Sequence, residues 1–240
     1  MRLAVISDVH GNRFALEAVL DDIAARSVDS TVNLGDLVSG PMEPNWTADI
    51  LMDAGLPTIR GNHERWLVER SPFGLDPVDR FTMTQLEQRH LDWFAALPAT
   101  LAILGEIYMC HGTPANDSEP WLDNWWQGRS TKLPDEAEVS AKANGLDFPV
   151  LLCGHTHLAR AVRLRDGRLI VNPGSVGLQI NHGSPDARYA IIERKDGRWA
   201  VSLRAVPYDH TAAARQATAN GFPRWTEALT TGWSGPDGLF

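Results

Sequence analysis

Five short motifs in the chain place Asp, Asn or His directly after an apolar run. They are Asp8-Val9-His10-Gly11-Asn12, Gly35-Asp36, Gly61-Asn62-His63-Glu64, His111-Gly112 and Gly154-His155-Thr156-His157. Carboxylate, imidazole and amide groups are common ligands of divalent metals. Residues two apart on an extended chain point to the same side, so Asp8 and His10 can reach one ion together. The motifs therefore predict that distant parts of the chain converge on a pair of metal ions.

Each motif taken alone also has an ordinary structural explanation. Asp36 fits a turn or cap residue, and His111 fits a half-buried histidine that has its own hydrogen-bond partner. The occurrence of all the motifs together favours metal binding over these explanations. A supporting role near the metals and a purely structural role both stay open for four further residues: Asn12, Arg60, Glu64 and Ser175.

The apolar runs that precede the motifs have the length and composition of buried strands. Residues 3–7, 31–34 and 57–60 are short apolar runs, a pattern typical of strands that are covered on both faces. An amphipathic helix follows Asn12, and residues 46–54 are predicted to form another. This alternation predicts a mainly parallel sheet, and ligands of such sheets gather beyond the carboxyl ends of the strands.

Three later segments have the pattern of antiparallel hairpins. They pair residues 101–103 with 107–110, 160–164 with 169–171, and 189–193 with 199–206. We expect these pairs to form a second sheet that packs on the first. The chain from 65 to 100 is predicted to be helical, with a break near 71–79 and an amphipathic stretch from 84 to 96.

The chain is predicted to form one domain over residues 1–240, with a core of about 1–207. Residues 113–146 are predicted to be an insertion near the mouth of the site. Its indoles, Trp121, Trp125 and Trp126, either pack the insertion on the core or form a wall for an aromatic or nucleobase leaving group. The tail at 211–240 begins as a short helix, and its remainder has no predicted position.

The composition is that of an ordinary globular protein with a moderate acidic excess. Hydrophobic residues make up 43% and charged residues 22% of the 240 positions, and the formal net charge is −8. Because lysines and arginines are scattered, the sequence argues against an extended nucleic-acid groove. A small anionic substrate stays compatible, since bound metals reverse the local field. The sequence leaves a monomer and a dimer equally open.

The beginning of the chain and the two cysteines favour a cytoplasmic protein. Residues 1–7 are too short, and too soon followed by Asp8, for a signal peptide. No run approaches the ~20 apolar residues that span a bilayer. Cys110 and Cys153 are predicted to be buried free thiols in a reducing compartment, with a lone disulfide as the alternative.

In this order, the five motifs resemble those of the calcineurin-like metallophosphoesterase superfamily, and the chain is most similar to its small bacterial and archaeal phosphodiesterase branch. The resemblance covers roughly residues 1–207. It implies an α/β fold in which two packed mixed β-sheets are flanked by helices, as a four-layer α/β/β/α sandwich. Any one motif is common by chance, and the specificity comes from all five occurring in order after predicted strands.

The resemblance also implies how the ligands are divided between two metals. Asp8, His10 and His157 would bind one ion, Asn62, His111 and His155 the other, and Asp36 would bridge them. Such a mixed nitrogen and oxygen site suits Mn, Fe, Zn, Co or Ni better than Mg or Ca, and we expect manganese. Because the set contains no Cys, a structural zinc site is a poor alternative.

Two divalent ions of this kind would make the chain a metal-dependent phosphoesterase. The two ions carry four positive charges, and two aspartates and a bridging hydroxide neutralise three of them. About one positive charge is left, and it can hold a phosphoryl group. We expect this hydroxide to attack phosphorus without a phosphoenzyme. In the family the His of Gly-Asn-His lies beside the leaving group, so His63 is the expected catalytic acid. Asn12 and Arg60 are the candidate substrate-binding residues.

The motifs divide the superfamily only in part. Arg60-Gly61-Asn62-His63-Glu64 also resembles the protein Ser/Thr phosphatases and the symmetrical diadenosine tetraphosphate hydrolases. Those families carry an Arg in Gly-Asp-x-Val-Asp-Arg-Gly, and residues 35–41 of this chain lack it. The substrate therefore stays open among phosphodiesters, nucleotides and phosphomonoesters. Some relatives are non-catalytic scaffolds, but the complete ligand set and His63 favour an enzyme.

Overall fold

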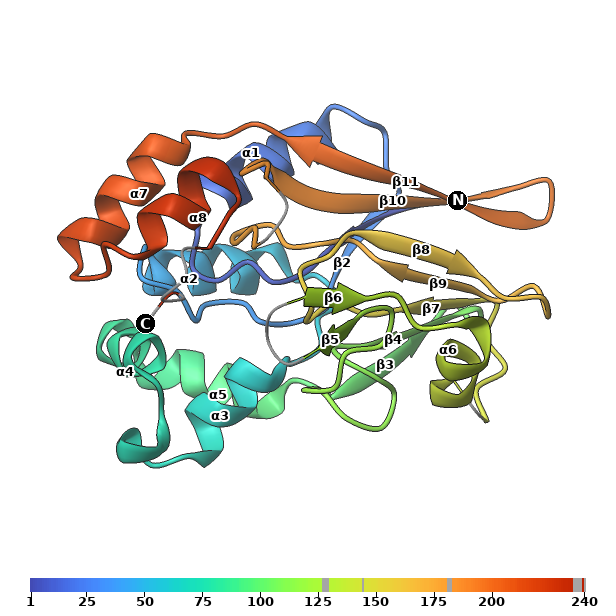
Figure 1. Cartoon of the computed structure of the whole chain (residues 1–240), viewed down its shortest axis with the longest axis horizontal. Helices are drawn as coiled ribbons and strands as arrows, with labels where there is room; N and C mark the ends of the chain where they lie inside the picture. Colours follow the sequence, from blue (N-terminus) through green and yellow to red (C-terminus); the bar gives the residue numbers. More distant parts are fainter. Residues whose placement is uncertain (127–129, 144, 181–182, 235–238, 240) are drawn as a thin grey trace.

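Two β-sheets pack face to face and carry helices on their outer faces in the computed structural model (Figure 1). The structure describes residues 1–126, 130–143, 145–180, 183–234 and 239. None of the helices in this described part is long and apolar enough to cross a bilayer. The four-layer arrangement predicted for the chain is therefore confirmed.

The first sheet has the strand order β11-β10-β1-β2. Its strands are β1 (Arg2–Ile6), β2 (Ser30–Asn33), β10 (Ala187–Lys195) and β11 (Arg198–Val206). β1 pairs in parallel with β2 and antiparallel with β10. The backbone N–H of Val176 donates to the carbonyl of Ser7, so the chain approaches β10 from the carboxyl end of β1. β10 therefore runs opposite to β1.

The second sheet has the strand order β3-β4-β7-β9-β8. Its strands are β3 (Thr100–Ile103), β4 (Ile107–Cys110), β7 (Val150–Leu152), β8 (Arg160–Arg163) and β9 (Leu169–Asn172). β4, β7 and β9 run parallel, and an antiparallel strand closes each edge. The first two predicted hairpins, β3–β4 and β8–β9, are thus present in this sheet.

Three sequence expectations about the sheets are corrected. Neither sheet is mainly parallel, because each mixes both kinds of pairing. The hairpin β10–β11 joins β1 and not the second sheet. The third strand expected at 57–60 is only an isolated bridge between Thr58 and Asn33. Pro57 has no N–H to donate, and α3 begins at Asn62, so little chain is left for a longer ladder.

Helices cover the outer faces of both sheets and the edge where the motifs lie (Figure 1). They are α1 (Arg13–Ala24), α2 (Pro44–Ala54), α3 (Asn62–Glu69), the 3₁₀ turn η1 (Pro72–Gly74), α4 (Pro77–Gln85), α5 (Gln88–Ala96), α6 (Glu136–Lys142), α7 (His210–Ala219) and α8 (Trp225–Thr231). Two helices begin at Pro, which suits the first helical turn. The predicted break in the region 65–100 contains η1, and α4 begins earlier than residue 84.

The buried residues of β1 alternate between the two cores of the molecule. Leu3 and Val5 belong to the core between the sheets, whereas Ala4 and Ile6 pack under α1 and its neighbours. Because successive residues of a strand point to opposite faces, this alternation explains the continuous apolar run in the sequence. Burial on both faces fixes the strand, and with it the position of the residues that follow it.

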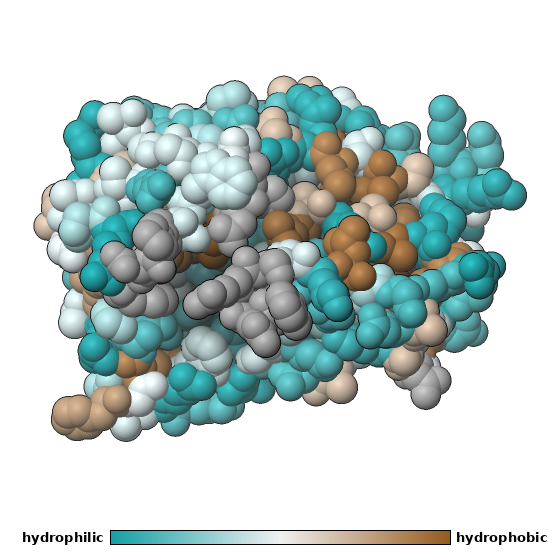
Figure 2. Space-filling view, viewed as in Figure 1, coloured by the Kyte–Doolittle hydropathy of each residue, from teal (hydrophilic) through white to brown (hydrophobic). Residues whose placement is uncertain are grey.

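The insertion at 113–146 is folded over the second sheet. It contains the ribbon of β5 (Asn124–Trp126) and β6 (Ser130–Lys132), followed by α6. Trp121 is 1% exposed, and its indole N–H donates to the carbonyl of Val139. Trp121 therefore packs the insertion on the core, while the side chains of Trp125 and Trp126 lie outside the described part. Figure 2 shows a largely hydrophilic face with a group of apolar side chains to the right of its centre.

The two cysteines are free and buried, as predicted. Burial raises the pKa of both thiols above the ordinary range. These thiols therefore behave as small apolar side chains in the core of the second sheet.

Candidate metal centre

The predicted ligands gather at the carboxyl ends of the strands, as expected for a sheet that positions a site by its strand ends. Asp8 follows β1, Asp36 follows β2, His111 follows β4, His155 and His157 follow β7, and Asn62 is the first residue of α3. Their side chains fall into two groups. Ligand atoms of Asp8, His10 and His157 lie within 4.8 Å of one another, and so do those of Asp36, His111 and His155.

The two groups contain the Asp and His residues that the resemblance assigns to the two ions, with Asp36 in the group of His111 and His155. The Oδ2 of Asp36 is 3.0 Å from Nε2 of His111, and its Oδ1 accepts a hydrogen bond from the backbone N–H of His63. Nε2 of His111 is also 3.9 Å from Oδ1 of Asp8. The two groups are therefore neighbours, and together their side chains would hold divalent cations.

The histidine rings are held in the tautomer that suits metal binding. Nδ1 of His10 lies 2.7 Å from the carbonyl of Ser39, and Nδ1 of His157 lies 2.8 Å from that of Leu178. Because a carbonyl only accepts, each Nδ1 carries the proton and each neutral ring presents Nε2 as an acceptor. These two Nε2 atoms face each other at 3.0 Å. A cation between them satisfies two acceptors that cannot satisfy each other.

Two buried oxygens of the centre add to the case for cations. Oδ1 of Asn62 and Oδ1 of Asp8 have no hydrogen-bond partner among the described residues. Leaving such atoms unsatisfied costs about 1–3 kcal/mol each, so both oxygens fit a site that would hold cations. Together with the imidazoles they form a mixed donor set that fits first-row divalent metals better than Mg or Ca.

Most of the predicted ligands have a left-handed backbone. The φ angles are 54° at Asp8, 50° at His10, 53° at Asp36, 68° at His155 and 61° at His157. This conformation costs of order 1 kcal/mol or more for a residue other than Gly, and Asp and His tolerate it better than most. The buried strands and their hydrogen bonds hold these residues in place, and the strain aims the side chains at one point.

Glu64 holds two of the motifs together without contacting the metal space. Its fully buried carboxylate accepts the backbone N–H groups of Asp36, Leu37 and Gly61 at 2.7–2.9 Å. A side chain at Gly61 would meet Oδ1 of Asp36 at 2.1 Å, so only Gly allows this approach. Burial and the charge of Asp36 raise the pKa of Glu64 to about 7. The role left open for Glu64 is thus that of a support.

The electrostatics of the centre keep some rings neutral and one charged. Burial lowers the pKa of both His10 and His155 to about 4, so both are in the form that binds metals. Burial would also lower the pKa of His111, but the charge of Asp36 raises it to about 10. Burial would raise the pKa of Asp36, and His111 instead lowers it. A metal at His111 must therefore displace one proton.

His63 lies beside the ligands and is paired with a residue that the sequence did not single out. Its Nδ1 is 2.9 Å from Oδ1 of the buried Asp79 on α4. Burial opposes the charged form of His63, but the charges of Asp36 and Asp79 outweigh it and raise the pKa to about 9. Asp76 caps α4 by accepting from the N–H of Asp79, which fixes the carboxylate under the ring. His63 is thus protonated at neutral pH.

A cavity of about 220 Å³ opens in front of the centre, and we call it the His63 pocket. Its lining includes the predicted ligands His10, Asp36, Asn62, His155 and His157, together with His63. The lining also has an apolar part, formed by Trp66, Val78, Leu178, Ile180, Trp225 and Leu239. Trp225 belongs to the tail that could not be placed from the sequence.

The predicted substrate-binding residues lie elsewhere. Asn12 is fully buried and caps α1 through its Oδ1, while its amide donates to the carbonyl of Gly177 and to Tyr208. These contacts account for its side chain. Ser175 likewise donates to the carbonyl of Asp8 and accepts from the N–H of Leu178. Both residues shape the loops that carry the ligands.

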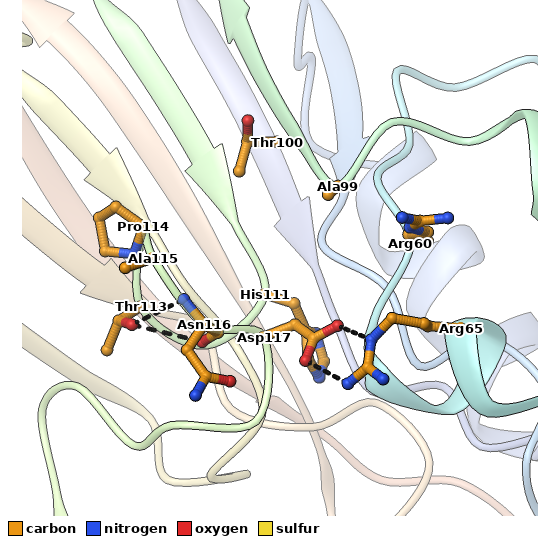
Figure 3. A pocket seen from close by; sticks show the side chains of 10 residues that line it. All are labelled: Arg60, Arg65, Ala99, Thr100, His111, Thr113, Pro114, Ala115, Asn116 and Asp117. Atoms are coloured by element: carbon orange, nitrogen blue, oxygen red, sulfur yellow. Dashed lines mark hydrogen bonds and ion pairs between the residues drawn. The ribbon is translucent and has the colours of Figure 1, made fainter. Parts of the chain in front are cut away.

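Arg60 lines a second cavity of about 340 Å³, which we call the Arg60 cavity (Figure 3). Arg65, whose guanidinium forms two hydrogen bonds with Asp117, lies on the same wall. His111 borders this cavity, but His63 does not. Arg60 has no carboxylate partner among the described residues. A substrate-binding role for Arg60 stays a prediction.

Asp79, Asp76 and Trp225 are the site residues that the sequence did not reveal. Asp76 caps α4 and Asp79 lies in its first turn, positions where acidic residues are common. With Pro77 between them, these residues indicate the start of a helix, and nothing in the sequence indicates a contact with His63. Trp225 lies far along the chain from every motif. Only the folded chain brings these residues to His63.

Comparison with known proteins agrees with this geometry. Residues 1–197 match the family model of the calcineurin-like phosphoesterase superfamily domain. An uncharacterised protein of Methanocaldococcus jannaschii is 27% identical, over 93% of this chain and 94% of its own length. The crystal structure of a metallophosphoesterase from Sphaerobacter thermophilus has a TM-score of 0.78 and 29% identity, covering 97% of this chain and 99% of that one. A putative diadenosine tetraphosphatase shares the fold, with a TM-score of 0.53 and 16% identity over 84% of this chain and 93% of its own.

Proposed function

Because the chain belongs to the calcineurin-like phosphoesterase superfamily, we propose that it hydrolyses a small phosphate ester, with phosphodiesters as the favoured class, at a centre of two divalent metal ions. Manganese is the first candidate for both ions. When bound, two such ions lower the pKa of a water molecule and neutralise charge on a phosphoryl group. The observation that supports this most directly is the pair of neighbouring ligand groups, which approach each other at His111 and Asp8.

The protein's own side chains divide the remaining work. Asp8 and Asp36 supply the negative charge that holds the cations, and His10, His155 and His157 supply neutral nitrogens. The His63 ring borders the open pocket, and Asp79 keeps its Nδ1 engaged. Its Nε2 proton is therefore the one that can be given to the ester oxygen as the bond to phosphorus breaks. Help of this kind is typically worth ~10²- to 10⁴-fold in rate.

The experiment that tests the proposal is a metal-dependent assay with two chromogenic esters. Purified protein is freed of metal with EDTA, reloaded with Mn²⁺, Zn²⁺, Co²⁺ or Ni²⁺, and offered bis-p-nitrophenyl phosphate and p-nitrophenyl phosphate. We expect release of p-nitrophenol that EDTA abolishes, and faster release from the diester. Absence of turnover with every metal would contradict the proposal and favour a non-catalytic scaffold.

Asp79→Asn is expected to move the alkaline limb of the pH–rate profile to lower pH. The charge of Asp79 and its hydrogen bond raise the pKa of His63, so removing the charge lowers that pKa. In the variant, protonated His63 therefore loses its proton at a lower pH than in the native protein, and the rate falls from that pH upward. The measurement is kcat/KM against pH with an alkyl ester, for the variant and the native protein. An unchanged alkaline limb would show that Asp79 has only a structural role.

A further inference from the structure

The wall of the His63 pocket that faces the metal centre comes partly from outside the matched family domain. The family model ends at residue 197, whereas α7 and α8 occupy residues 210–231. Trp225, the first residue of α8, is 2% exposed and packs in one cluster with Met42, Val78 and Leu178. The tail is therefore anchored to the core, and it brings a large aromatic ring to the pocket.

A second indole completes the apolar side. Trp66 on α3 packs edge-on against the ring of His63, with centroids 4.9 Å apart, and the guanidinium of Arg70 lies over its face at 4.1 Å. These contacts fix the indole next to the group that would protonate the ester oxygen. The atoms attached to that oxygen would therefore lie near Trp66, and Trp225 lines the same pocket.

The charges around the pocket limit what can occupy it. Among the described residues that line it, none is Lys or Arg, and Asp76 adds a carboxylate to the rim. A leaving group that carries further phosphates would face this carboxylate without a cation to balance it. Arg60 and Arg65 line the other cavity, which His63 does not border.

The size of the pocket narrows the choice further. An apolar cavity of about 150 Å³ accommodates a benzene molecule in another protein. The His63 pocket, at about 220 Å³, thus has room for one ring beside a phosphoryl group. A dinucleotide leaving group would extend beyond this volume.

We infer that the His63 pocket receives an uncharged aromatic or arylalkyl alcohol as the leaving group, and that Trp225 and Trp66 determine this preference. The inference rests on the proposed phosphoesterase activity. In the reaction an oxygen of water forms a bond to phosphorus, and the bond between phosphorus and the ester oxygen breaks. The electron pair stays on the ester oxygen, which takes the proton of His63, and the proton lost by water passes to the solvent.

The first test compares two esters whose alcohols have similar acidity but different polarity. Benzyl phosphate and 2-methoxyethyl phosphate, or their methyl diesters if diesters are turned over, are assayed with the metal-loaded protein. Burial of a ring should give the benzyl ester a kcat/KM at least about tenfold higher, since even one methylene in an apolar pocket is worth about 10-fold or more. Inorganic pyrophosphate is expected to be a poor substrate.

Variants assign this preference to the two indoles. Trp225→Leu and, at a half-buried position that tolerates change more readily, Trp66→Leu should each reduce the benzyl preference at least about threefold. Trp121→Leu is the matched control, because it truncates a buried indole that lies outside the pocket. The ratio of the two kcat/KM values is the readout, so a general loss of folded protein cancels.

A binding measurement keeps the inference separate from the activity. Benzyl alcohol is titrated into ¹⁵N-labelled protein, and the indole N–H signals are assigned with the three variants. We expect the signals of Trp66 and Trp225 to move while that of Trp121 stays. Failure to hydrolyse any ester would contradict the proposed function, but it would leave the binding of benzyl alcohol at Trp66 and Trp225 unaffected. Hydrolysis of both esters with equal kcat/KM, or no shift at Trp66 and Trp225, would overturn the inference alone.

Discussion

Asp36→Asn is expected to remove most of the activity and at least one metal ion. The side chain of Asp36 lies 3.0 Å from His111 and contacts the N–H of His63, at the point where the two ligand groups meet. Asn keeps the shape of Asp and accepts the φ of 53°, but it brings no charge to hold two cations. The loss of an outer partner of a ligand typically costs ~10- to 100-fold. Loss of the bridging charge should exceed this.

The measurement pairs metal content with rate. Native and variant proteins are dialysed against limiting Mn²⁺, and their metal stoichiometry and kcat/KM are determined together. Asp196→Asn is the matched control, since Asp196 also has a left-handed backbone, with φ 50°, in the turn between β10 and β11. The control should keep both metal and rate. A variant that retained two ions and full activity would contradict the bridging role.

Buried strands and the residues after them could be predicted from the sequence because they follow simple local rules. The run Leu3 to Ile6 is apolar at every position, and its alternate residues fill two different cores. A polar residue directly after such a run must leave the sheet at its carboxyl edge. The positions of Asp8 and His111 at the site therefore follow from the local sequence.

The pairing partners of a strand depend on distant segments, and the sequence carries little trace of them. The sequence of the hairpin β10–β11 has the same pattern whether the hairpin joins β1 or the second sheet. The path of the chain beside Ser7, where Val176 donates to the carbonyl of Ser7, places the hairpin next to β1. Pro57 and its neighbours have the apolar character of a strand. They make only one bridge, because the chain turns into α3 soon afterwards.

The polar partners of His63 could not be predicted for a related reason. The sequence separates Asp79 from His63 by a break and a 3₁₀ turn, so no periodicity connects them. For the insertion that holds Trp121, packing on the core and a wall of indoles at the site were both open. Trp121 packs inside its own cluster and donates to the carbonyl of Val139, whereas Trp225 from the tail lines the pocket. Contacts of this kind arise from tertiary packing, which overrides what single segments suggest.

Substitution of His63 separates the work of proton transfer from that of metal binding. His63→Ala is expected to keep the metals, since this ring belongs to neither the group of Asp8 nor that of Asp36, and to lose ~10²- to 10⁴-fold in kcat for an alkyl ester. The ring is paired with Asp79, and its raised pKa of about 9 keeps it protonated at neutral pH. Because an alkoxide is a poor leaving group, loss of the proton donor should reduce the rate most strongly with alkyl esters.

The identity of the leaving group provides the decisive comparison. A p-nitrophenolate ion leaves readily without a proton, so the variant should lose far less activity toward p-nitrophenyl esters than toward alkyl esters. Imidazole added to His63→Ala should restore part of the rate with the alkyl ester, because the truncation leaves space beside the ring of Trp66. Equal losses with both kinds of ester would mean that His63 orders the site and does not donate a proton. In that case the general acid would have to be sought among the other groups that border the pocket, of which Asp76 is the nearest in sequence to Asp79.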